Sequence, residues 1–166
     1  MIDAFVKYIQ SERRYSPLTV RNYQHDIESF VSWCTENTIS DQDQFDFTKV
    51  ATEDIREWII YRSTTCKIGA ASINRELSSL RSFYKFLRKQ GVVSQDIFGK
   101  ITSLRTPRRL PTFVPETRMA SLLDNLREHS QRGDFVEQRN ALIISLFYGC
   151  GIRLAELLNI HIGDIS

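Results

Sequence analysis

The feature of this 166-residue chain that most constrains its fold is the spacing of its apolar residues. They recur every three or four positions along most of the sequence, which is the period of one face of an α-helix, whereas the alternation typical of strands is nearly absent. The sequence therefore predicts an all-α protein. In the first part of the chain the pattern marks four helices, which begin near Ile2, Pro17, Thr52 and Ala70.

Local signals indicate where these helices begin and end. Ser16 can cap the second helix, and Pro17 suits its first position because the amide that proline lacks would have no partner there. Thr52 is expected to cap the third helix, and Gly91 to end the fourth. Four short amphipathic helices predict a compact bundle.

The pattern changes at residue 100. From Lys100 to Pro115 the chain holds three prolines and four basic residues, which predicts an extended linker. Pro115 then opens another helix, and the apolar run Asn140–Tyr148 predicts a helix buried on all sides in a larger body. Gly149 and Gly151 are expected to break that helix.

Three parts are therefore expected: a helical bundle at 1–99, a basic linker at 100–114 and the first part of an incomplete second domain at 115–166. The longest apolar stretch, 141–148, is too short to cross a bilayer, so membrane roles are excluded. The N-terminus does not resemble a signal peptide, and a cytoplasmic protein is expected.

The sequence gives no sign of a metal or cofactor. Cys34, Cys66 and Cys150 are widely spaced and form no C-x-x-C pair, so neither a disulfide framework nor a zinc site is indicated. The three histidines also lack metal-ligand spacing. No cofactor and no metal are therefore expected.

Charge is distributed very unevenly for a chain whose net charge is only +2. Residues 22–61 carry nine acidic residues against Lys49 and Arg56, whereas residues 62–109 carry eleven basic residues against Glu76 and Asp96. Such a concentration of positive charge is expected of a surface that binds a polyanion, although a solvated helix face would look the same.

The fourth helix carries this charge in one stripe. Cationic and short hydrogen-bonding side chains align along it, and no acidic residue follows Glu76 to neutralise them. That mixture suits phosphate oxygens and base edges in a major groove, so double-stranded DNA is the predicted partner. The stripe consists of Asn74, Ser78, Arg81, Lys85 and Arg88, with Arg75 beside it.

The beginning of the second helix and the linker add further candidate contacts. Helix amides and nearby cations favour anions at the former, and the linker is basic. We expect the duplex to lie between the second and fourth helices. The added candidates are Arg14, Thr19, Arg21, Asn22, Arg105, Arg108 and Arg109.

Four blocks of the sequence resemble the tyrosine recombinases, especially Xer-type and integrase-like members. They are S-P-L-T-V-R-N-Y (16–23), S-I-N-R-E-L-S-S-L-R-S-F-Y-K-F-L (72–87), R-R-L-P (108–111) and Y-G-C-G-I-R-L-A-E-L (148–157). The resemblance implies a SAM-like core-binding domain, a linker and the beginning of a catalytic domain. It also implies DNA strand exchange through a phosphotyrosyl intermediate in a homo- or hetero-tetramer.

By this resemblance, Arg153 is the first catalytic arginine, which would stabilise the charge that develops on the scissile phosphate. Glu156 would support it by orienting the guanidinium or the turn below it. The alternative, from the residues alone, is that Arg153 caps carbonyls at a helix corner and Glu156 is a surface partner.

The chain also departs from the family pattern. It has no H-x-x-R box, and none of its six tyrosines lies in the block of the family nucleophile. The chain is therefore expected to be a fragment or a natural truncation, monomeric in solution and unable to cut DNA alone. Two other functions remain open: a non-cutting DNA-binding regulator at recombination sites, and a helical module that binds an acidic protein.

Overall fold

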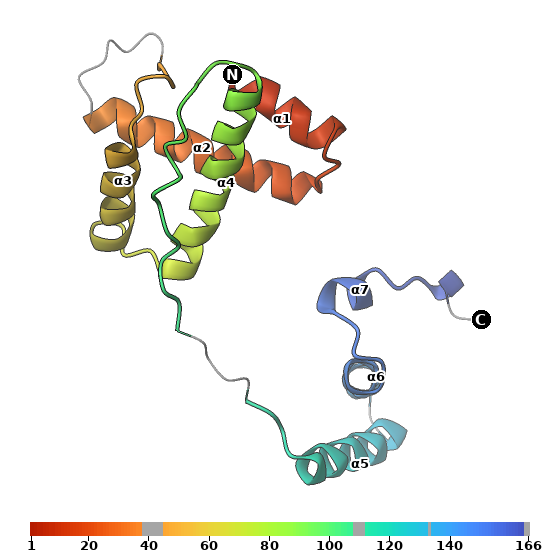
Figure 1. Cartoon of the computed structure of the whole chain (residues 1–166). Coiled ribbons are helices and arrows are strands. Elements are labelled where there is room, and N and C mark those ends of the chain that lie inside the picture. Colours follow the sequence, from red (N-terminus) through yellow and green to blue (C-terminus); the bar gives the residue numbers. More distant parts are fainter. Residues whose placement is uncertain (38–44, 108–111, 133, 165–166) are drawn as a thin grey trace. The chain divides into compact units, whose positions relative to one another are not determined.

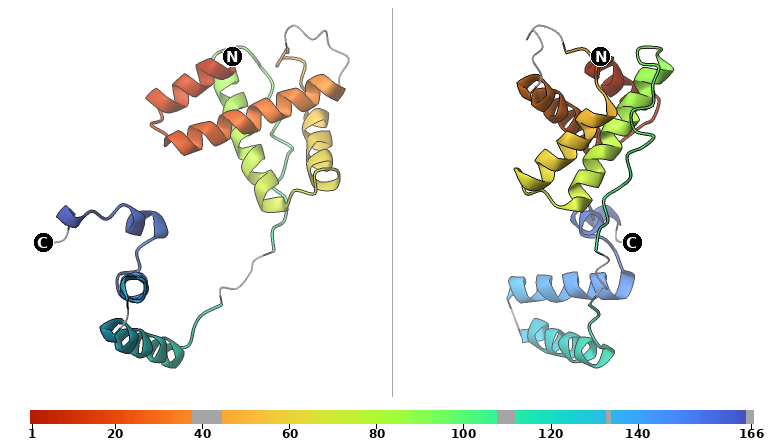
Figure 2. Two further views of the ribbon diagram at one scale, coloured as in Figure 1. Left: turned by 180° about the vertical axis from the view of Figure 1, so that it is seen from behind. Right: turned by 60° about the vertical axis from the view of Figure 1, so that its left-hand side comes forward.

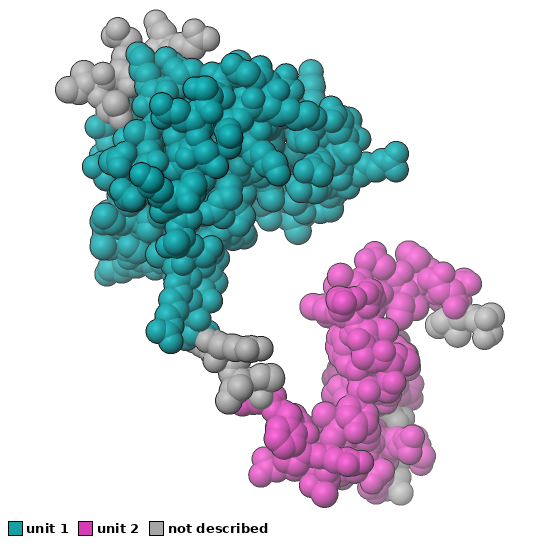
Figure 3. Space-filling view, viewed as in Figure 1, with its two compact units in different colours: residues 1–108 teal, residues 109–166 magenta. Residues whose placement is uncertain are grey.

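The computed structural model describes residues 1–37, 45–107, 112–132 and 134–164, and every regular element in these ranges is a helix (Figure 1). The all-α prediction is therefore confirmed. The chain falls into two compact units, residues 1–108 and residues 109–166, which are drawn in different colours in Figure 3.

Unit 1 is a four-helix bundle centred on its longest pair of helices. α2 crosses α4, α1 packs against α2, and α3 contacts both α2 and α4 (Figures 1 and 2). The four helices are α1 (Ile2–Ser11), α2 (Pro17–Asn37), α3 (Thr52–Thr64) and α4 (Ala70–Lys89).

The core of unit 1 forms where the apolar faces of these helices meet. Ile73, Leu80 and Leu87 of α4 are fully buried, as the helical spacing predicts. Aromatic rings fill the centre, with Phe5 of α1 lying edge-on to Phe83 of α4 at 5.2 Å between centroids. Burying one such side chain stabilises the fold by about 1.5–3 kcal/mol, so this face decides how α4 is oriented.

The predicted ends of the helices agree with the structure except at α3. Ser16 Oγ accepts the Thr19 amide at 3.2 Å at the beginning of α2, and Gly91 follows α4 with φ +71°. The prediction that Thr52 caps α3 is wrong, because the capping position is Ala51. The Asp54 carboxylate accepts the Ala51 amide at 2.7 Å, which leaves the Thr52 hydroxyl to donate to the carbonyl of Ile97.

The segment predicted as a linker is not separate from the bundle along its whole length. Ile101 is buried and Leu104 is partly buried against the core of unit 1. Residues 101–107 and 112–115 have no regular structure, and residues 108–111 of the predicted linker lie outside the described residues. The prediction that residue 100 marks the separation overlooked these apolar side chains, whose burial holds the chain on α4.

Unit 2 contains α5 (Glu116–Arg132), α6 (Phe135–Cys150), the short α7 (Leu154–Leu158) and a 3₁₀ turn (Ile162–Asp164). α5 packs against α6. Asp134 caps α6 by accepting the amides of Val136 and Glu137, and Gly151 ends it with φ +62°.

One expectation for α6 needs correction. Gly149 does not break α6 but lies inside it, because only Gly151 adopts the left-handed conformation that ends a helix. The burial of α6 in a larger body stays a prediction: within the described residues Leu142 is 60% exposed and Tyr148 is 52% exposed, and only Ala141 of this helix is buried. Among the described residues, no helix has the length and apolar content needed to cross a membrane.

Candidate nucleic-acid interface

The segment that follows α4 runs along one side of the helix's outward face. After Gly91 the chain turns back, and residues 95–105, which we name the strap, run along α4 toward its N-terminal end (Figures 1 and 2). The strap therefore lies along one edge of the stripe that the sequence predicts to bind DNA.

Three members of the predicted stripe hold the strap. Asn74 donates to the Leu104 carbonyl at 2.9 Å and accepts the Leu104 amide at 2.8 Å. Arg81 donates to the Ile101 carbonyl at 3.1 Å. Their polar groups are thus at least partly occupied within the molecule.

The third fastening is an ion pair, Arg88 Nη1 to Asp96 Oδ2 at 3.2 Å, in which both side chains are about half exposed. Apolar burial anchors the strap more firmly than this pair, since Ile97, Phe98 and Ile101 are all at least nine-tenths buried. An exposed ion pair contributes only about 0–1 kcal/mol, so packing, not charge, keeps the strap in place.

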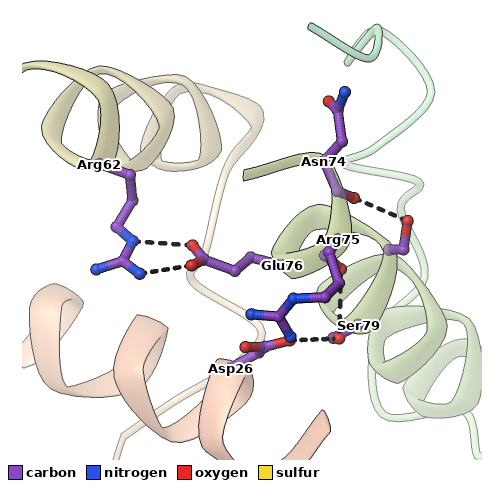
Figure 4. A network of polar contacts seen from close by, with 7 residues as sticks. Asp26, Arg62, Asn74, Arg75, Glu76 and Ser79 are labelled. Atoms are coloured by element: carbon purple, nitrogen blue, oxygen red, sulfur yellow. Dashed lines mark hydrogen bonds and ion pairs between the residues drawn. The ribbon is translucent and has the colours of Figure 1, made fainter. Parts of the chain in front are cut away.

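Arg75, on the opposite edge of the α4 face, reaches across to α2 (Figure 4). Its Nη1 donates to Asp26 Oδ2 at 2.7 Å, and the Ser79 hydroxyl donates to the same oxygen at 2.7 Å. Asp26 is 2% exposed whereas Arg75 is 51% exposed. Arg75 therefore has a structural partner in addition to its exposed surface.

A second buried carboxylate, that of Glu76 on α4, is also paired with an arginine of another helix. Glu76 accepts two bonds from the Arg62 guanidinium of α3, the first of them at 2.8 Å from Nε (Figure 4). Hydrogen bonding to the Glu76 carboxylate, the larger cause, and its charge both raise the pKa of Arg62. This pair joins α3 to α4, and only 18% of the Arg62 side chain is exposed.

Lys85 lies between the two edges, exposed and with no ion pair among the described residues. Beside it the surface sinks into a hollow of about 640 Å³ between the end of α1 and the end of α4. The hollow is lined by four cations and two hydroxyls and by no carboxylate from the described residues. Its polar lining residues are Arg13, Ser82, Lys85, Arg88, Lys89 and Ser94, beside the ring of Tyr8.

The predicted contacts at the beginning of α2 are mostly exposed. Arg14, Arg21 and Asn22 are exposed and make no side-chain bond with other described residues. Thr19 is half-buried, and its hydroxyl is paired with that of Ser16 at 2.8 Å. Arg14 has φ +51°, a left-handed conformation that favours glycine at the end of a helix.

The remaining predicted contacts in the stripe and the linker are exposed or lie outside the described residues. Ser78 is exposed and donates to the Asn74 carbonyl of its own helix at 2.8 Å. Arg105 is exposed just after the strap's last fastening, and Arg108 and Arg109 lie outside the described residues. Lys67, which was not among the predicted contacts, is an exposed cation between α3 and α4 with φ +54°.

In unit 2, Arg153 and Glu156 are bound to each other at the start of α7. Arg153 Nη1 donates to Glu156 Oε1 at 2.8 Å, and the Arg153 amide donates to Oε2 at 2.8 Å. The backbone bond, followed by the side-chain bond, lowers the pKa of Glu156. The Arg153 side chain remains 84% exposed. No cluster of metal-ligating side chains occurs in the parts of the chain that the structure covers.

Comparison with known proteins gives one family and several relatives. Residues 2–91 match the phage integrase, N-terminal SAM-like domain family. The chain is 31% identical to tyrosine recombinase XerC of Oceanobacillus iheyensis over 99% of its length and 51% of that protein. It is 32% identical to XerC of Lactobacillus delbrueckii subsp. bulgaricus and 30% identical to XerC of Escherichia coli, again over 99% of its length and 52% of each relative.

Among solved structures, the chain is similar to that of XerA recombinase, with a TM-score of 0.46 and 20% identity over 99% of this chain and 50% of that one. The chain thus spans about half the length of the curated relatives that it matches.

Proposed function

We propose that this chain, which belongs to the Xer-type tyrosine recombinases through its phage integrase N-terminal SAM-like domain, acts in site-specific DNA recombination. In this proposal unit 1 binds duplex DNA, and Arg153 is one of the catalytic arginines. A homo- or hetero-tetramer would assemble on DNA with the rest of the catalytic machinery, while the chain alone is monomeric.

The observation that carries the DNA-binding part is the hollow at the end of α4. Its cations converge from α4 and from the turn between α1 and α2, and among the described residues only Arg88 of these four has an ion pair, with Asp96. Phosphate groups supply the matching charge at close spacing, and a duplex presents them whatever its base sequence. Lys85 lines this hollow, is exposed, and has no ion pair among the described residues.

A salt titration tests this part. Removing one phosphate contact should reduce the slope of log affinity against log salt by about 0.9, so we expect this loss in a Lys85→Ala variant with a fluorescent duplex. Lys49→Ala removes the same charge from an exposed site in the acidic part of the chain and serves as control. Equal slopes for Lys85→Ala and the unsubstituted protein would show that Lys85 makes no phosphate contact and would contradict DNA binding at this hollow.

The catalytic part is supported by the Arg153–Glu156 pair. A guanidinium stabilises charge that develops on phosphate oxygens, and removing one such aimed donor typically costs about 2.7–4 kcal/mol of barrier. In a full-length recombinase containing this chain, Arg153→Ala should therefore reduce single-turnover cleavage by orders of magnitude while leaving site binding near normal. Arg153→Lys should restore little, because an ammonium lacks the planar fork.

The helix-corner alternative predicts a different result for the same protein. If Arg153 serves only the fold, Arg153→Ala should lower the melting temperature and leave activity per folded molecule unchanged. Measuring both quantities on one sample separates the two roles.

A second candidate function is a DNA-binding regulator that occupies sites without cutting them. It is favoured by the tyrosines: Tyr84 is buried, four others pack against the core of unit 1, and the sixth is Tyr148 on α6. In both proposals the 166-residue chain alone should form no covalent adduct with a nicked suicide duplex. A shifted band on a denaturing gel, mapped to any of these tyrosines, would contradict that expectation.

A further inference from the structure

Asn74 makes a contact that the DNA-binding stripe does not require. Its side-chain amide donates to the Leu104 carbonyl at 2.9 Å, and its side-chain oxygen accepts the Leu104 amide at 2.8 Å. The two bonds hold both polar groups of one residue, as a neighbouring strand would, across thirty positions of sequence. The backbone of Leu104 is thereby bonded to α4 through both its donor and its acceptor.

The two bonds between Asn74 and Leu104, which we name the clamp, lie near the end of the strap. Asp96 and Ile101 are fastened to α4 earlier along the strap, by Arg88 and Arg81. Among the described residues, Leu104 is the last one of the strap that is bonded to α4, and its side chain is the last that packs on the core of unit 1. Arg105 follows directly, exposed and with no side-chain partner among the described residues.

We propose that Asn74 is a positioning residue, which fixes where the basic linker leaves the bundle and so holds Arg105 against the DNA backbone. This inference rests on the proposed function and reassigns Asn74 from a direct DNA contact to a contact made through the linker. Without the clamp, the backbone just before Arg105 is no longer bonded to α4, and the entropy of ordering it opposes the contact of Arg105 with a phosphate.

The proposal makes a specific statement about coupling. If Asn74 acts through Arg105, Asn74→Ala weakens DNA binding only while Arg105 is present. The penalty of the double variant should then equal that of Arg105→Ala alone, including its loss of about 0.9 in salt slope. If Asn74 contacts DNA itself, the two penalties on log affinity add.

The experiment is a double-mutant cycle measured by fluorescence anisotropy on a mixed-sequence duplex, with circular dichroism to show that all variants are folded. Ser78→Ala is the matched control, because Ser78 is exposed one turn further along α4 and bonds only its own helix. Its penalty should add to that of Arg105→Ala.

Hydrogen exchange in the absence of DNA provides an independent readout. The Leu104 amide should be protected in the unsubstituted chain and in Arg105→Ala, and should lose protection in Asn74→Ala. Additive penalties, or a Leu104 amide that exchanges equally in all three, would overturn the inference while DNA binding stands. If the unsubstituted chain fails to bind duplex, the proposed function is overturned together with the inference.

Discussion

Arg75 and Lys85 lie on the same exposed side of α4, yet the structure gives them different consequences for folding. Arg75 donates to Asp26, which is 2% exposed and, within the described part of the chain, receives one other side-chain bond, from Ser79. Lys85 has no such partner among the described residues. Substitution by alanine should therefore lower the free energy of unfolding at Arg75 and leave it nearly unchanged at Lys85.

The magnitude follows from the burial of the two partners. Removing one member of a fully buried pair costs about 3–5 kcal/mol, and a hydrogen bond to a charged group contributes about 1.5–3 kcal/mol. Arg75 is half exposed, so water can replace part of its contact with Asp26. We expect the lower range, a loss of about 1.5–3 kcal/mol in unfolding free energy for Arg75→Ala, against less than about 0.5 kcal/mol for Lys85→Ala.

Urea unfolding, followed by circular dichroism in the absence of DNA, measures both changes. Asp26→Asn keeps the shape of the side chain and removes its charge, so Arg75→Ala should cost much less in that background. An Arg75→Ala variant as stable as the Lys85→Ala variant would refute the reasoning. An equal cost of Arg75→Ala in both backgrounds would refute the assignment to Asp26.

Three further predictions concern single groups. Arg14→Gly should relieve the left-handed strain and raise the unfolding free energy by about 0.5–1 kcal/mol, while weakening duplex binding in the same preparation. Burial raises the pKa of Cys34 to about 12, so it should resist alkylation at pH 8 until the protein unfolds, whereas exposed Cys150 should react at once. In an NMR titration the pKa of Glu156 should lie below its usual range, and it should remain partly lowered in Arg153→Ala because the bond from the backbone amide persists. The contact between Glu156 and Arg153 should therefore be fully present above the ordinary pKa of a glutamate and be lost as the pH falls through the lowered pKa.

The bundle could be predicted from sequence because helix faces depend on local spacing. Ile73, Leu77 and Leu80 are buried as their spacing requires, and Ser16 caps α2 as its identity suggests. Both signals lie within a few residues of the structure that they determine. The Thr52 prediction was wrong because α3 begins one residue earlier than its side chain suggests: Ala51 is the capping position, and the Thr52 hydroxyl donates to the Ile97 carbonyl, forty-five positions away in the sequence.

The division of the α4 face could not be predicted in this way. The stripe was expected to be free because the sequence offers its cations no acidic neighbour. Arg81 and Asn74 are nevertheless engaged by backbone groups of the strap, which every residue possesses and no sequence pattern marks. Arg75 is paired with a carboxylate forty-nine positions away. An absence of local acidic residues therefore says little about long-range partners.

The contact between Arg153 and Glu156 is compatible with both roles considered for the arginine, and the donor inventory explains why. A guanidinium has five N–H donors, and one nitrogen of Arg153 donates to Glu156 while the side chain remains 84% exposed. Glu156 also accepts the Arg153 amide, so its carboxylate contacts both the backbone and one terminal guanidinium nitrogen of Arg153. An ion pair as exposed as this one contributes little to stability, and the guanidinium nitrogens that Glu156 does not engage can donate to phosphate oxygens, which is what a catalytic arginine requires.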